Sequence, residues 1–299
     1  MGKFTKNTQE GPKVEDLKYS LYIQKQLMHL EPYMFVEDMT HHYSVTLCKK
    51  FSNELFFDFD GDYEKFKAVF GYDFLRYELD KLLSRITKNL LFFGIAYVER
   101  VFWFDENDTI KRVTYHCINC FRIKNRCKNI IYSLKDSNGK KYKGKIDRDN
   151  IIVFKLKDIG FSKRFFIKKI KKLKKLGFPK ANLSSNKDFS WSVLNSKQDY
   201  YLLKIMKDVY WSARKNNNKY ITEPYLIYRQ MQYEKLANTF LEYLITKINT
   251  DIHGINKKIG VNGNIKFDSI TKNYDELLVE FNTGKKNCKE IGDIIFKGL

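Results

Sequence analysis

The chain has 299 residues, 43% of them hydrophobic, and a formal charge of +20 from 55 basic and 35 acidic side chains. That hydrophobic fraction suffices for a packed core, and the charge favours an acidic partner such as nucleic acid. No window approaches the eighteen or so apolar residues of a membrane span. The N-terminus lacks a signal peptide's apolar region and the five cysteines are an odd number, so we expect reduced thiols in the cytoplasm.

The N-terminal quarter is predicted to be helical after a polar start. Residues 1–15 are expected to form a disordered arm. Apolar side chains at helical spacing predict a helix over 17–30 that stops before Pro32, and a second helix is expected over 33–50.

A long helix that runs through a glycine into a hairpin organises the middle of the chain. Apolar residues recur three or four positions apart over 74–93, and Gly94 then breaks the pattern as a helix C-cap or a site of close backbone approach. Residues 95–103 and 110–115 are rich in strand-formers on either side of a turn at 105–108.

The following strands and helices complete a mixed pattern. A hairpin signal at 136–139 and an apolar strand at 151–156 predict a meander of about five strands over 94–157. Helices are expected at 162–176, 199–215, 225–249, 274–281 and 288–296, with a short strand at 265–267 and loops at Gly254, Gly260 and Gly263. The fold class is therefore α+β, with regions 1–15 (arm), 16–69 (helical), 70–160 (α/β core), 161–250 (helical) and 251–299 (small α/β and helical end).

Three carboxylates form the first candidate site. Asp58, Asp60 and Asp62 would share one face of a strand, where they could hold divalent cations for nucleotidyl or phosphoryl transfer. The alternative is an acidic turn that ends the strand or caps the next helix, and the pattern favours this interpretation. No distant third carboxylate with a His or Lys motif accompanies the cluster.

Cysteines form the second candidate. The CxxC pair Cys117 and Cys120 resembles half of a zinc knuckle, and His116 with Cys127 could complete four ligands. Because a second CxxC or HxxxH motif is missing, buried thiols are the favoured interpretation. No phosphate-loop, dinucleotide-binding or hydrolase motif occurs either, so we expect no enzyme, no cofactor and no metal site.

The third candidate is a basic helix over 162–176. Its apolar side chains form one stripe that would pack against the rest of the protein. Lysines cover the remaining surface: Lys168, Lys169, Lys171, Lys172, Lys174 and Lys175. These side chains suit the phosphate backbone of DNA or an anionic surface, and a solvated face on a packed helix is the equal alternative.

The segment 89–99, with letters NLLFFGIAYVE, resembles the portal proteins of tailed bacteriophages. Similarity continues through the acidic turn at 105–108, the strand at 150–157, the long helix at 225–249 and the strand at 265–268. Ile95 stands where Asn is usual, 115–123 lacks the expected proline, and the chain is short for a portal. The resemblance implies a β-rich wing over 70–157, with long helices supplying stem and channel. Gly94, Ala96, Tyr97 and Glu99 would then form a structural hinge within the wing.

The resemblance also implies a function without catalysis. Portal proteins form a ring, usually of twelve subunits, at one capsid vertex, and double-stranded DNA enters and leaves through it. The implied partners are further copies of the chain, the large subunit of the terminase, the major capsid or scaffolding protein and a head–tail adaptor. The implied location is the virion, after assembly in the host cytoplasm. Two alternatives remain open: a metal-dependent nucleic-acid enzyme using Asp58, Asp60 and Asp62, and a DNA-binding accessory protein of a mobile element.

Overall fold

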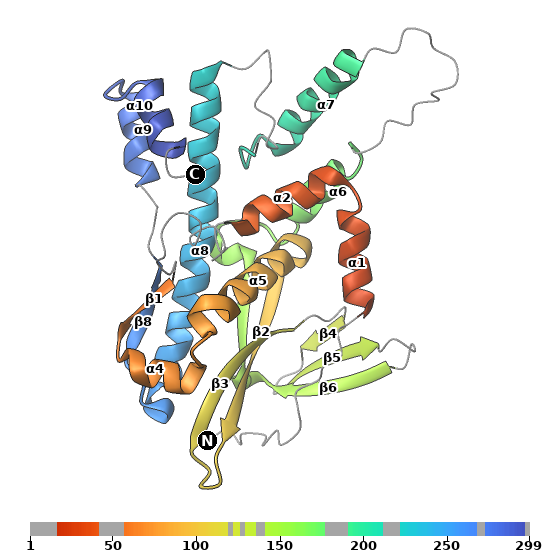
Figure 1. The fold of residues 1–299 in the computed structure, drawn as a ribbon. Helices are drawn as coiled ribbons and strands as arrows, with labels where there is room; N and C mark the ends of the chain where they lie inside the picture. The colour runs from red at the N-terminus through yellow and green to blue at the C-terminus, as the bar shows by residue number, and fades with distance from the viewer. Residues whose placement is uncertain are drawn as a thin grey trace.

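The computed structural model describes residues 17–41, 57–118, 122–125, 129–135, 141–176, 191–211, 222–267 and 273–296. Within these ranges the chain is a mixture of helices and strands, arranged as Figure 1 shows. The helices are α1 (Leu17–Leu27), α2 (Leu30–His41), α4 (Tyr63–Phe70), α5 (Leu79–Phe93), α6 (Phe165–Leu173), α7 (Trp191–Met206), α8 (Glu223–Ile259), α9 (Tyr274–Asn282) and α10 (Cys288–Phe296). A π-helical turn, η1 (Phe74–Glu78), leads into α5, and two 3₁₀ turns, η2 (Arg148–Asn150) and η3 (Leu156–Ile159), flank β7.

Within the described residues, the strands form three small antiparallel sheets. They are β3 (Ile110–Cys117), β2 (Ile95–Phe104) and β7 (Ile151–Lys155) in that order; β4 (Arg122–Asn125), β5 (Asn129–Lys135) and β6 (Lys141–Asp147); and β1 (Phe57–Gly61) with β8 (Gly263–Phe267). The expected single meander is thus wrong in topology. After the β5–β6 hairpin the chain returns to the central sheet, where β7 pairs with the free edge of β2 through Val98 opposite Ile152.

The central sheet is covered by helices on one face. Ala96, Val98 and Phe102 of β2 alternate toward this face and are buried, as period-two patterning requires. They join one hydrophobic core that extends from Phe35 in α2 to Ile265 in β8. Helices α2, α5 and α8, the central sheet and β8 therefore share this core.

Helix α8 has 37 residues and a length of roughly 55 Å. Its C-terminal half lies beside β7 and β8, whereas its N-terminal half extends away from the sheets (Figure 1). There Ile227 and Met231 form a separate cluster with Leu277, Leu278 and Ile291 of α9 and α10, whereas Tyr233 and Phe240 belong to the main core. Among the residues that the structure describes, no helix has the length and hydropathy to cross a bilayer.

Several helix boundaries differ from those predicted. Helix α2 begins at Leu30, so Pro32 lies in its first turn, where a missing backbone N–H costs little. Gly254 is not in a loop but inside α8, because the surrounding apolar stripe continues to Ile255. Helix α6 is only nine residues long, and the next helix runs over 191–206 rather than 199–215.

Candidate functional site

Gly94 joins three elements at one point. It ends α5 in the left-handed conformation, with φ of 72° and its N–H bonded to Leu90 O at 2.8 Å. Its carbonyl accepts the N–H of Leu156 at 3.2 Å, and a Cβ at this position would lie 2.2 Å from the carbonyl oxygen of Lys163. Gly94 is therefore both a C-cap and a site of close backbone approach, as predicted.

The other members of the expected hinge line both faces of β2. Ala96 is buried at 1% exposure, and Tyr97 and Glu99 are half-buried on the opposite face. Glu99 lies across from His116 on β3 and Ile151 on β7. Burial raises the pKa of the Glu99 carboxyl to about 7 from an ordinary value of 4.5. The protein therefore holds a carboxyl that titrates near neutrality inside the segment that carries the resemblance.

A polar cluster between the central sheet and α8 was not predicted. Arg100 forms an ion pair with Asp251 at 3.4 Å, and both side chains are less than 15% exposed. Asp251 also accepts the hydroxyl of Tyr115 at 3.0 Å, while Arg100 donates to the backbone carbonyl of Asp149. Burial raises the pKa of Asp251, and Arg100 and the Tyr115 hydrogen bond oppose this shift. These contacts tie two strands to one helix.

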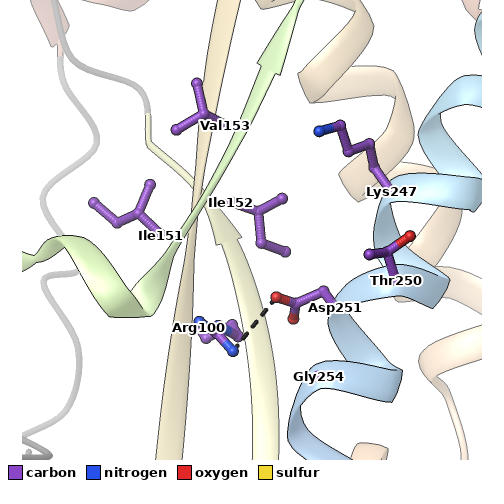
Figure 2. A pocket seen from close by; sticks show the side chains of 8 residues that line it. All are labelled: Arg100, Ile151, Ile152, Val153, Lys247, Thr250, Asp251 and Gly254. Atoms are coloured by element: carbon purple, nitrogen blue, oxygen red, sulfur yellow. Dashed lines mark ion pairs between the residues drawn. The ribbon is translucent and has the colours of Figure 1, made fainter. Parts of the chain in front are cut away.

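A cavity of about 420 Å³ lies beside this cluster, open to solvent. Figure 2 shows Ile151, Ile152 and Val153 of β7 on one side of it and Lys247, Thr250 and Gly254 of α8 on the other. The sequence contained one indication that Arg100 is part of such a cluster. Arg100 falls in phase with the buried Ala96, Val98 and Phe102, and a charged residue on a buried face needs a partner. Nothing in the sequence identified Asp251 as that partner.

The six candidate lysines, four in α6 and two directly after it, have different surroundings. Lys168, Lys171, Lys172 and Lys175 are exposed, and Lys174 is half-buried. Lys169 is only 7% exposed. Its ammonium group donates to Asp208 Oδ2 and to Ile205 O, both at 2.9 Å, so it links α6 to the end of α7. Lys169 is therefore engaged inside the fold, unlike the exposed lysines, and DNA binding by the group stays a prediction.

The end of α7 is held by two further contacts that the sequence did not indicate. Trp211 donates its indole N–H to Asp38 of α2 at 2.8 Å. Arg229 of α8 is 2% exposed and donates to the carbonyls of Tyr210 and Trp211 at 3.2 and 2.7 Å. Burial lowers the pKa of its guanidinium. Helices α2, α6 and α8 therefore all fix residues 205–211.

The three carboxylates of the first candidate site make other contacts. Asp58 and Asp60 lie on the exposed face of β1, and Asp60 pairs with Lys266 at 2.6 Å. Asp62 caps α4, accepting the N–H of Lys65 at 3.1 Å, as the favoured alternative predicted. The part of the chain that the structure describes holds no group of three or more His, Cys, Asp or Glu side chains suited to a metal ion.

Cys117 is a buried thiol, as favoured, and accepts a hydrogen bond from Asn89 Nδ2 at 3.0 Å. Burial raises its pKa to about 12, so it stays protonated at neutral pH. Its neighbour His116 is exposed. The remaining members of the proposed zinc knuckle, Cys120 and Cys127, lie outside the described residues.

No model of a known protein family matches the sequence, and comparison with curated proteins finds no relative.

Proposed function

We propose that this chain is the subunit of a portal ring, through which double-stranded DNA enters and leaves a capsid at one vertex. In this proposal about twelve copies assemble, and the ring binds the large subunit of the terminase, the capsid or scaffolding protein and a head–tail adaptor. The chain performs no chemistry and acts as a conduit. The proposal rests first on the resemblance of the segment 89–99 to portal proteins.

The observation that carries the proposal is the position of that segment in the fold. Gly94 joins α5, β2 and the start of α6, and its close approach to Lys163 leaves no room for a side chain. The residues that resemble portal proteins thus lie where the backbone conformation restricts the choice of side chain. Residues of this kind determine the fold and do not form a binding or catalytic site, as expected for a structural protein without catalytic activity.

Two features of the surface support assembly into a ring. The N-terminal half of α8 extends beyond the central sheet, covered mainly by two short helices, as Figure 1 shows. On α7 and in the first turn of α8, the side chains of Tyr200, Tyr201 and Tyr225 are between 46% and 61% exposed. Tyrosine is enriched at protein interfaces relative to the rest of the surface.

A first experiment determines the oligomeric state of the purified full-length chain. Negative-stain microscopy and light scattering should show closed rings of about twelve subunits. A chain that stays monomeric and binds DNA with strong salt dependence would contradict the proposal and favour the accessory DNA-binding protein.

A second experiment separates the ring from the metal-dependent enzyme. The double variant Asp58→Ala/Asp60→Ala removes two exposed carboxylates from β1 without disturbing the Asp62 cap of α4. We expect this variant to form the same rings as the wild type and to package DNA equally well. Loss of packaging with normal rings would show that these carboxylates have an active role.

A further inference from the structure

Two surfaces of opposite charge lie at opposite ends of strand β2. At one end Gly94 touches Lys163, which leads into α6 with its exposed lysines Lys168, Lys171 and Lys172. At the other end the β2–β3 turn carries Asp105, Glu106 and Asp108, all exposed. Figure 1 shows the hairpin projecting beyond the other elements drawn as ribbon, with α6 near the far end of the sheet.

The structure describes no acidic side chain that compensates the charge of the lysine face. In the described ranges none of Lys168, Lys171 and Lys172 has an acidic partner, whereas Lys169 is neutralised by Asp208. Positive charges three or four residues apart on a helix repel one another. An external anion that binds this face therefore relieves a repulsion already present in the subunit.

The acidic turn is preformed. Asp105 Oδ1 accepts the N–H groups of Asn107 and Thr109 at 2.9 and 2.8 Å, and Asp108 takes a left-handed conformation with φ of 59°. Glu106 belongs to this turn, whose backbone conformation the hydrogen bonds already fix. Binding through the Glu106 carboxylate therefore orders little additional chain.

The two surfaces cannot meet within one subunit. Strand β2 has ten residues, so its ends are roughly 30 Å apart, and ladders to β3 and β7 hold it in the sheet. Complementary patches at two ends of a rigid element favour head-to-tail association, in which the tip of one copy contacts the helix of the next. Repetition of such a contact closes a ring when the rotation between copies allows it.

We infer that the exposed lysines of α6 bind the acidic β2–β3 turn of a neighbouring copy of this chain. This inference rests on the proposed ring and identifies one of its subunit contacts. DNA is the competing anion, but a ring that placed this many lysines along its channel would grip the DNA it must release, because each neutralised phosphate adds to affinity. A contact between subunits uses the same lysines without that cost.

Three variants of the full-length chain test the contact. The turn variant is Glu106→Lys/Asp108→Asn, where Asn tolerates the left-handed backbone of residue 108. The helix variant is Lys171→Glu/Lys172→Glu, and the third variant combines all four changes. The control is Lys285→Glu/Lys289→Glu, which makes the same charge change as the helix variant at two exposed positions, Lys285 between α9 and α10 and Lys289 in the first turn of α10. Mass photometry measures the ring fraction against concentration, at low and high salt, and a gel-shift assay measures binding to duplex DNA.

We expect each double variant to raise the concentration needed for assembly at least about tenfold, and the combined variant to recover most of this loss. High salt should weaken wild-type assembly and have less effect on the two double variants. The control should assemble like the wild type.

Three results would overturn the inference. Assembly of both double variants at the wild-type concentration would show that neither surface contributes. Additive losses without recovery in the combined variant would show that the surfaces act on different partners. Normal rings with lost DNA binding in the helix variant would assign the lysines to DNA and leave the ring proposal intact. A wild-type chain that forms no ring would instead remove the proposed function together with the inference.

Discussion

The phenolic hydroxyl of Tyr115 donates to Asp251 Oδ2 at 3.0 Å across 136 positions of sequence. Tyr115 is buried in β3 beside the rings of Phe70 and Phe74, and Asp251 lies on α8. The bond therefore connects the central sheet to the longest helix in the described part of the chain.

Tyr115→Phe should lower the free energy of unfolding by roughly 1–2 kcal/mol, because it removes a buried hydrogen bond and keeps the ring packing. Urea denaturation measures the change. Tyr201→Phe, at an exposed tyrosine, is the matched control and should shift stability by less than about 0.5 kcal/mol. Equal effects of the two substitutions would mean that the Tyr115–Asp251 bond contributes nothing.

Gly94→Ala should destabilise the protein by more than about 2 kcal/mol. The left-handed backbone disfavours alanine by about 1 kcal/mol, and a Cβ 2.2 Å from Lys163 O forces the backbone apart. Gly260→Ala separates the two causes, since Gly260 ends α8 with a similar φ of 68° and a Cβ there would have no other atom within 4 Å. The Gly260 variant should lose only about 1 kcal/mol in the same denaturation experiment, and an equal loss at both sites would contradict the close approach.

The raised pKa of Glu99 should make the stability of the protein depend on pH. Its folded-state pKa of about 7 exceeds the ordinary value of 4.5, so the folded state binds more protons between these values. The free energy of unfolding should therefore fall as pH rises from about 4.5 to about 7 and then level off. Glu99→Gln removes this contribution and should be more stable than the wild type by roughly 1–2 kcal/mol at about pH 8, with little difference at about pH 4. A wild-type-minus-variant difference that does not change with pH would refute the raised pKa.

Lys169→Met should destabilise the contact between α6 and α7 by roughly 1–3 kcal/mol, because it leaves Ile205 O without its ammonium donor and removes the ion pair with Asp208. Lys168→Met, one residue earlier and exposed, should have almost no effect on stability. If the two substitutions destabilise equally in urea, Lys169 does not have the structural role that its position indicates.

Local patterns in the sequence determined much of this protein. Helical spacing predicted the helix that ends at Gly94, and strand-formers flanking a turn predicted β2 and β3. The sequence also indicated Asp62 as a possible helix cap and Cys117 as a buried thiol. These features depend on neighbours within a few residues, so their physical causes are visible in the sequence.

Tertiary structure alone decided which distant segments meet. The pairing of β1 with β8 joins residues about two hundred positions apart, and the return of β7 to β2 replaced the expected meander. The partners of Arg100 and Lys169 are likewise remote, at Asp251 and Asp208. Period-two alternation places Arg100 in phase with a buried face, whereas helical periodicity placed Lys169 on the surface. In both cases the neutralising carboxylate is selected by packing, because burial of a charge is tolerated only where the fold brings its counter-charge within reach.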